Sequence, residues 1–228
     1  MYTIINYLVS GASKLSLALE LRKAKEYFDN LEVIREDMIK RSRDILNLCR
    51  TIISKIILRE DVEKLVGDLN HKFQELSEII KNFPELQYSN NFYSIAGEYV
   101  EAIQLYYITQ KHRVLQIEEL NIHPIPYLHG LIEVIGELKR LSLDLVRKDM
   151  FEEAYKLLEI AENLYTSLSS LSYPDAVLPG FRRKLDIYRK VIDDWKKFLI
   201  DMESRRRLIH RLNTVLKYIK HEDTGNGR

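Results

Sequence analysis

Residues 95–108 read IAGEYVEAIQLYYI, and this apolar stretch decides the fold. Its apolar side chains recur at helical spacing, and its only charged residues are Glu98 and Glu101. The pattern extends in both directions and predicts a helix over residues 88–115. The middle of the chain is therefore a long, mostly apolar helix.

The rest of the chain has the same helical character. Of its 228 residues, 46% are hydrophobic and 30% are charged, which is enough apolar material for a sizeable core. Only 8 Gly and 5 Pro are present, so turns and strand ends are scarce. Helical spacing recurs over residues 15–52, as one helix or as two divided at residues 29–30, and over residues 62–80, 127–146, 151–171 and 181–218.

Prolines mark the expected breaks between these segments. Residues 82–84, 123–126 and 173–180 each contain proline, which disfavours helix in the residue before it. We expect an all-α fold, a single antiparallel bundle of long helices spanning residues 1–222. The polar residues 223–228 are expected to form a frayed tail.

Composition also limits location and chemistry. No stretch approaches 18 uncharged apolar residues, and residues 1–11 lack the basic lead of a signal peptide, so a cytoplasmic protein without a membrane span is expected. Cys49 stands alone, so one chain cannot form a disulfide, and its apolar surroundings predict a small core residue. The net charge of +1 gives no overall attraction to nucleic acid, so any such role depends on local patches.

Acidic residues inside apolar helices are the most informative feature. Glu98 and Glu101 are three residues apart, and Glu133 and Glu137, four apart, are the only charged residues of segment 126–138. Each spacing places a pair on one helix face, where like charges repel. A divalent cation such as Mg²⁺ or Mn²⁺ would relieve that repulsion and could activate water against a phosphoryl group.

Other interpretations of these pairs stay open. Same-face glutamate pairs also occur on solvated helix edges, and Lys139 or Arg140 could pair with Glu137. A di-iron bundle requires Glu-x-x-His, which neither pair has, because Gln104 and Arg140 occupy the third following positions. All-α nucleotide pyrophosphatases, which also use paired helical acids, remain a rival class.

Four segments resemble the translin/Trax family, and Trax in particular. Residues 98–102 resemble its Glu-Tyr-Val-Glu-Ala, and residues 127–137 its Tyr-Leu-x-Gly-x-x-Asp-x-x-Gly-Glu. Residues 40–45 are similar to its Lys-x-Ser-Arg-Asp-Ile, and residues 183–194 have the Leu-x-x-Tyr or Leu-x-x-Leu spacing of its late helix. The similarity spans roughly residues 30–207. Residues 88–96 lack the basic stretch of translin itself, so the chain resembles the catalytic member of the family.

The resemblance implies a seven-helix translin-like fold and a metal-dependent endoribonuclease. Four acids match the ribonuclease site of the family and are expected to act both as metal ligands and as catalytic residues. They are Glu98, Glu101, Glu133 and Glu137. At Glu133 the family usually has Asp, so the charge is kept on a longer side chain. The resemblance further implies a closed, octamer-like homo-oligomer that acts on single-stranded RNA within it.

Basic residues recur along two helical segments. Arg35, Lys40 and Arg43 are the candidate RNA-binding residues, because they include the Trax-like segment, and Arg50 and Lys55 continue the series. A second cluster covers residues 205–211 and is as readily explained as a solvated helix surface. The leading hypothesis is a Mg²⁺- or Mn²⁺-dependent endoribonuclease. The alternatives are a non-catalytic RNA-binding scaffold and a nucleotide pyrophosphatase.

Overall fold

The computed structural model describes residues 11–225, with side chains described over residues 16–217. This part of the chain contains eight α-helices and no strand. They are α2 (Gly11–Ile57), α3 (Glu63–Ile80), α4 (Pro84–Gln87), α5 (Asn90–Gln110), α6 (Ile117–Leu120), α7 (Pro124–Arg147), α8 (Phe151–Ser169) and α9 (Phe181–Gly225). The all-α prediction is confirmed, and none of these helices is long and apolar enough to cross a membrane.

The ends of the expected domain lie partly outside the described residues. Residues 1–10 of the span 1–222 and residues 226–228 of the expected tail are not described. Helix α9 continues through residues 223–225, so the part of the expected tail that is described is helical.

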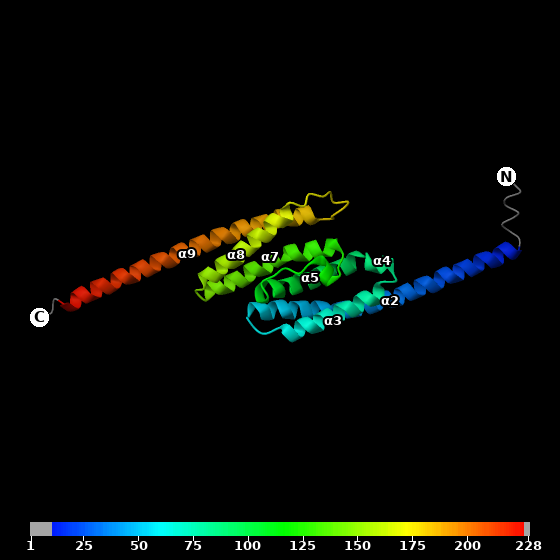
Figure 1. Ribbon diagram of the computed structural model, residues 1–228, viewed down its shortest axis with the longest axis horizontal. Coiled ribbons are helices and arrows are strands. Elements are labelled where there is room, and N and C mark those ends of the chain that lie inside the picture. The colour runs from blue at the N-terminus through cyan, green and yellow to red at the C-terminus, as the bar shows by residue number, and fades with distance from the viewer. Residues whose placement is uncertain (1–10, 226–228) are drawn as a thin grey trace.

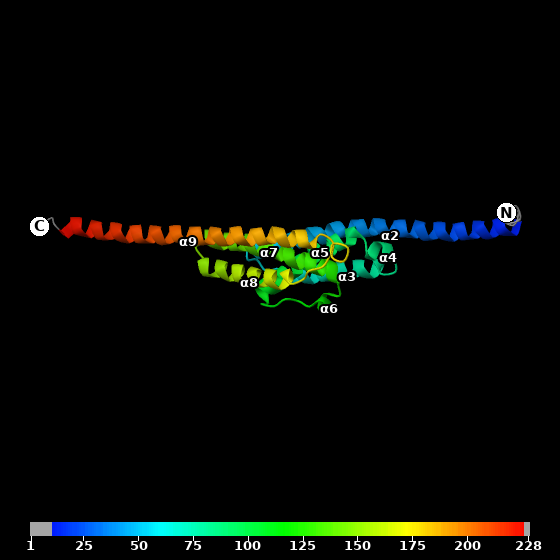
Figure 2. The ribbon, with the colours of Figure 1, turned by 90° about the horizontal axis from the view of Figure 1, so that it is seen from above.

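Helices α5 and α7 form the centre of the bundle. Figures 1 and 2 show α2 and α3 packed on one side of this pair and α8 and α9 on the other. Helix α5 is buried on nearly every side, as its apolar sequence requires. Cys49 of α2 is fully buried in the same core, as predicted.

Local sequence explains where α5 and α7 begin. The Ser89 hydroxyl accepts a hydrogen bond from the Phe92 N–H at 3.1 Å and caps α5. Helix α7 starts at Pro124, which needs no N–H donor in the first turn, and His123 Nδ1 accepts from the Ile125 N–H at 3.3 Å.

The helix predicted over residues 88–115 is shorter in the structure. It ends at Gln110, and His112 then takes a left-handed conformation with φ of 55°. The buried side chain of Gln104 holds the following segment, donating to the Leu115 carbonyl at 2.9 Å and accepting from its N–H at 3.0 Å. Apolar periodicity did not reveal that the helix ends at Gln110, because Leu115 fits the helical spacing of apolar residues. Its backbone, however, is hydrogen-bonded to the Gln104 side chain and not to a preceding helical turn.

A buried hydroxyl joins the three later helices. Trp195 of α9 is fully buried, and its indole N–H donates to the Ser142 hydroxyl of α7 at 3.0 Å. That hydroxyl in turn donates to the Ala154 carbonyl of α8 at 3.3 Å. Both polar groups are thereby satisfied inside an apolar core.

Gly130 allows α7 to approach α5 closely. A Cβ atom at this position would lie 2.4 Å from the Gly97 carbonyl oxygen and 2.6 Å from the Val100 Cβ. Both neighbours belong to α5, and one of them is backbone that cannot move aside. The contact therefore requires glycine at this position of α7.

We predict that Gly130→Ala destabilises the fold by about 1–3 kcal/mol, because the added methyl group forces α5 and α7 apart. Urea unfolding of the metal-free protein measures this. Gly67→Ala is the matched control: Gly67 also lies within a helix, but its added Cβ meets nothing within 4 Å. The control should gain roughly 1 kcal/mol through helix propensity. Equal stability of Gly130→Ala and the native chain would contradict the close contact.

Candidate functional site

The contact between α5 and α7 brings the two acidic pairs together. Glu98 and Glu101 project from α5 and Glu133 and Glu137 from α7, and all four side chains are half-buried. The charges of both α7 residues act on both α5 residues. The four carboxylates, which we call the acid cluster, thus lie close enough to influence one another, and their role as a site stays a prediction.

Electrostatic strain is concentrated on the two α5 carboxylates. Burial, followed by the charge of Glu133, raises the pKa of Glu98 above its ordinary value, while Arg50 and Lys184 oppose this. Burial, then Glu133 and Glu98, raise the pKa of Glu101 to about 8. Neither residue forms an ion pair or hydrogen bond within the described part of the chain. Burial therefore favours the protonated form of these carboxyl groups, and their ionised form has no ion-pair partner to compensate it.

The two α7 carboxylates already have partners. Glu133 accepts a hydrogen bond from Lys184 of α9 at 2.6 Å. Glu137 lies 3.4 Å from Arg140, one turn further along α7. The sequence suggested the second pair through its spacing. It gave no sign of the first, because Lys184 lies 51 residues away.

Helix α9 forms one wall of the acid cluster. Besides Lys184 it contributes Tyr188, one turn later, whose ring lies 3.6 Å from the position of a Cβ on Gly136. Burial, together with the charges of Glu133, Glu101 and Glu137, strongly raises the pKa of the Tyr188 hydroxyl. This phenol therefore keeps its proton in the neighbourhood of the carboxylates.

The acid cluster has the donor chemistry of a metal site without the compact arrangement of one. Carboxylate oxygens are the ligands that Mg²⁺ and Mn²⁺ prefer. Among the described residues, however, no group of three or more His, Cys, Asp or Glu side chains is placed to hold a metal ion. The Lys184 ammonium instead supplies positive charge to the cluster.

The predicted RNA-binding residues lie on α2, and they differ in how free their side chains are to contact RNA. Lys40 and Arg43 are exposed and, three residues apart, share one side of the helix. Arg50, seven residues beyond Arg43, continues that side and lowers the pKa of Glu98. Arg35 is instead engaged by Glu32 through two hydrogen bonds at 2.8 and 2.9 Å. The exposed basic side of α2 therefore leads toward the acid cluster.

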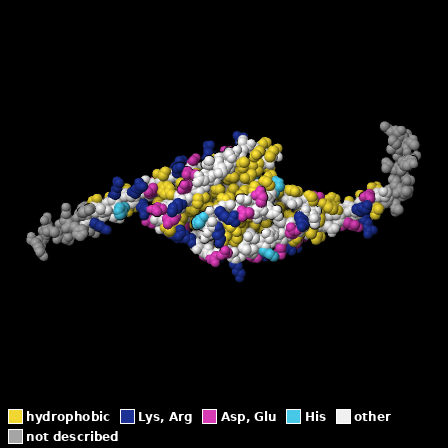
Figure 3. All heavy atoms as spheres, in the orientation of Figure 1, with side chains coloured by type: hydrophobic (Ala, Val, Ile, Leu, Met, Phe, Trp, Pro, Cys, Tyr) yellow, Lys and Arg dark blue, Asp and Glu magenta, His cyan; other side chains and the backbone are white. Residues whose placement is uncertain are grey.

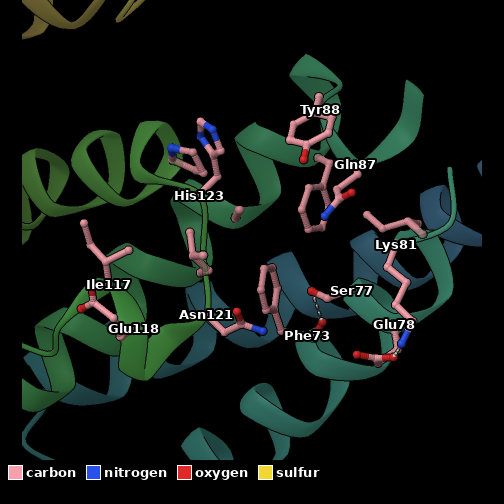
Figure 4. Close-up of a pocket in the computed structure, with 15 residues that line it drawn as sticks. Phe73, Ser77, Glu78, Lys81, Gln87, Tyr88, Ile117, Glu118, Asn121 and His123 are labelled. Carbon is pink, nitrogen blue, oxygen red and sulfur yellow. Dashed lines mark hydrogen bonds and ion pairs between the residues drawn. The ribbon is translucent and has the colours of Figure 1, made fainter. Parts of the chain in front are cut away.

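A separate cavity of about 500 Å³ lies elsewhere, between α3, the start of α5 and the segment before α7. Phe73, Tyr88 and His123 line it, together with the ion-paired Glu78 and Lys81 (Figure 4). None of the four acids of the cluster contributes to its lining. The acid cluster is thus not the floor of this cavity.

Residues 33–203 match the family model of the Translin family. The chain belongs to the Translin family. It is also similar to an uncharacterized protein of Methanocaldococcus jannaschii, with 31% identity over 198 residues that cover 83% of this chain and 87% of that protein. The resemblance found in the sequence is therefore confirmed.

Solved structures share the fold of this Translin-family chain. The crystal structure of apo-NeC3PO superposes with a TM-score of 0.71 at 30% identity, covering 80% of this chain and 96% of that one. The crystal structure of AfC3PO gives 0.68 at 24% identity, covering 82% and 98%. AfC3PO in complex with duplex RNA gives 0.66 at the same identity and coverage. These matches confirm the translin-like all-α fold, and the roles of the individual acids stay predictions.

The raised pKa of Glu101 predicts how stability depends on pH. Unfolded glutamate titrates near pH 4.3, about four units below the folded group. Between these values the folded state binds more protons, so the free energy of unfolding falls as pH rises, by up to about 1.4 kcal/mol per pH unit. Glu101→Gln should remove this fall and exceed the native chain in stability at pH 8, but not at pH 4.

Urea unfolding with a chelator present, from pH 4 to pH 8.5, measures this effect. Glu159→Gln, on the exposed face of α8, is the control and should follow the native profile. Parallel profiles for Glu101→Gln and the native chain would show that Glu101 ionises normally in the folded protein.

Proposed function

We propose that this Translin-family chain binds RNA along α2 and cleaves it at the acid cluster with the help of Mg²⁺ or Mn²⁺. The observation that carries the proposal is the position of Glu98 and Glu101, which are half-buried beside the α7 carboxylates without an ion-pair partner among the described residues. Buried like charges cost stability, and a bound cation offsets that cost. Structural similarity to AfC3PO, which was solved with duplex RNA, supports RNA as the substrate class.

In this proposal the four carboxylates hold the cation. Such an ion supplies a nucleophilic water at neutral pH and stabilises negative charge on a phosphoryl oxygen. Lys184, which pairs with Glu133 at 2.6 Å, would supply positive charge to a substrate phosphate at the same site. The Tyr188 hydroxyl donates a hydrogen bond in the same space. Lys40, Arg43 and Arg50 bind the RNA backbone through charge.

Metal binding in this proposal requires a local rearrangement. The Lys184–Glu133 ion pair is half-buried, so its exchange for a cation affects both affinity and stability. The same ion pair favours one alternative function, because a cluster neutralised by lysine would serve a scaffold that binds RNA without cutting it. The decisive experiment is incubation of the protein with labelled single-stranded and duplex RNA, with and without Mg²⁺ or Mn²⁺.

We predict that the double variant Glu98→Gln, Glu101→Gln cleaves RNA more slowly by orders of magnitude but binds it normally, because only the cation ligands are lost. Mg²⁺ should raise the melting temperature of the native chain and raise that of the variant less. Gel-based cleavage, binding titrations and thermal melts measure the three quantities. A double variant that melts well below the native chain yet cuts RNA at the native rate would remove the acids from the site.

Two control variants make this test specific. Glu75→Gln with Glu78→Gln changes a pair of the same spacing on the exposed side of α3 and should leave cleavage intact. Lys184→Met should increase the stabilisation by Mg²⁺, because Glu133 loses its internal partner. Lys196→Met breaks a comparable ion pair of α9, with Glu162 at 2.7 Å, and should not change the response to Mg²⁺.

Native protein that binds RNA without cutting it would establish the scaffold function. Release of pyrophosphate from nucleoside triphosphates would establish the pyrophosphatase.

We also predict that replacing Lys40 and Arg43 together with Ala weakens RNA binding and lowers its salt slope by about two, one for each lost phosphate contact. Fluorescence titrations at several salt concentrations measure the slope. Lys190→Ala with Lys197→Ala removes two exposed lysines of α9 and should leave the slope unchanged. An unchanged slope in the α2 variant would exclude Lys40 and Arg43 from the RNA contact.

A further inference from the structure

The cavity between α3, the start of α5 and the segment before α7 has no part in the proposed function, and we call it the aromatic cavity. Its volume of about 500 Å³ lies within the range of small-molecule sites, about 300–1,000 Å³. Ala96 lines it and precedes Glu98 by two residues, which at 3.6 residues per turn places the two on nearly opposite sides of α5. The aromatic cavity is therefore a second concave surface, across α5 from the acid cluster.

Aromatic rings form much of the wall of this cavity. Phe73 of α3 is buried, and its ring stacks on that of Phe92 of α5, with the ring centres 5.8 Å apart. Tyr88 is 57% exposed and meets His123 edge to face, with the ring centres 6.1 Å apart. The His123 ring is itself held by stacking on Tyr93 at 5.2 Å. The exposed rings therefore offer a fixed surface against which a planar ligand can stack.

Two amide side chains line the same cavity. Gln87 belongs to α4 and Asn121 follows α6, and Figure 4 draws both around the space that Phe73 borders. No hydrogen bond joins either amide to the other residues drawn there. Each amide offers two donor hydrogens and an acceptor oxygen, so it can pair with the donor and acceptor atoms on the edge of a nucleobase. The cavity thus combines stacking surface with free hydrogen-bonding groups.

The charged residues of the cavity favour a base over a phosphate. Among its described lining residues Lys81 is the single Lys or Arg, and it is paired with Glu78. Glu118 adds a second carboxylate to the lining. The face of the body drawn in Figure 3 carries both acidic and basic side chains, in keeping with the net charge of +1. A phosphate in the cavity would meet two carboxylates and one ammonium that is already neutralised, whereas an uncharged planar ring avoids that repulsion.

We propose that the aromatic cavity is a binding site for a nucleobase. The base stacks against Tyr88 and His123, and its polar edge forms hydrogen bonds with Gln87 and Asn121. Purines and pyrimidines share these features, so the base belongs either to a free nucleoside or to an RNA strand. The inference stands apart from cleavage at the acid cluster, because no acid of that cluster lines the cavity.

The space beside the aromatic cavity leaves room for either source of the base. A second cavity of about 370 Å³ adjoins it along α3, and both are lined by Phe73 and Asn121. Tyr107 lines the second cavity, and the Arg113 guanidinium lies 5.1 Å from the centre of its ring. An RNA strand with one base in the aromatic cavity therefore has space for a neighbouring nucleotide, whereas a free nucleoside occupies the first cavity alone.

Two variants of the full chain test the site. Tyr88→Leu removes the exposed ring but keeps an apolar side chain, and its control is Tyr173→Leu, which changes a tyrosine that is 54% exposed and lies outside the cavity. Asn121→Gly removes the amide and suits the left-handed backbone there, where φ is 50°. Its control is His112→Gly, at a φ of 55° outside the cavity. Thermal melts confirm that all four variants fold.

Equilibrium dialysis against the four labelled ribonucleosides, and against a short single-stranded RNA oligonucleotide, measures binding. A chelator is present throughout, so the outcome is independent of metal-dependent cleavage, and ribose and an abasic oligonucleotide control for binding without a base. Tyr88→Leu and Asn121→Gly should each weaken binding of at least one probe by about fivefold or more, and their controls should not. Weakened nucleoside binding identifies a free nucleoside as a ligand, and an effect confined to the oligonucleotide identifies the RNA strand. Unchanged affinity for every probe in both cavity variants, or equal binding of the probes that lack a base, would overturn the proposal.

Discussion

The close approach of α7 to α5 at Gly130 is the contact on which the rest of the structure depends. The Gly97 carbonyl occupies the space that any side chain at position 130 would need. Because the two helix backbones meet here, Glu98 and Glu101, which follow Gly97 on α5, lie close enough to Glu133 and Glu137 of α7 for their charges to interact. The same contact builds the core and concentrates negative charge, so the stability of the bundle and the character of the acid cluster have one origin.

The acid cluster divides into two halves with different electrostatics. The α7 carboxylates are neutralised by Lys184 and Arg140, whereas those of α5 have no ion-pair partner among the described residues, and burial and the neighbouring carboxylates raise their pKa. A purely structural cluster would gain from neutralising all four residues, since buried unpaired charge is costly. The uneven compensation places the electrostatic stress on Glu98 and Glu101, which lie in the Trax-like segment 98–102.

Much of the fold could be predicted from the sequence, because apolar periodicity and the positions of prolines are local signals of helices and their ends. The limits of α7 and α8 and the break before Pro84 followed from them within a few residues. The break after Gln110 did not, because it depends on a side-chain amide that bonds the backbone eleven residues away. Similarly, spacing on α5 and α7 predicted that each acidic pair shares one helix face, while the approach of Lys184 depends on how α9 packs. A single sequence carries no local mark of such long-range pairs.

The hydrogen bond between Trp195 and Ser142 has a consequence for the placement of α9. Trp195 lies seven residues after Tyr188 and eleven after Lys184, so the three side chains share one stripe of the helix. A helix rises about 1.5 Å per residue, so Lys184 lies roughly 16 Å from the indole along the axis. Anchoring the indole nitrogen to one buried oxygen fixes both the rotation and the depth of α9 at that point. A single polar contact in the core thus sets the distance over which an ammonium group reaches Glu133.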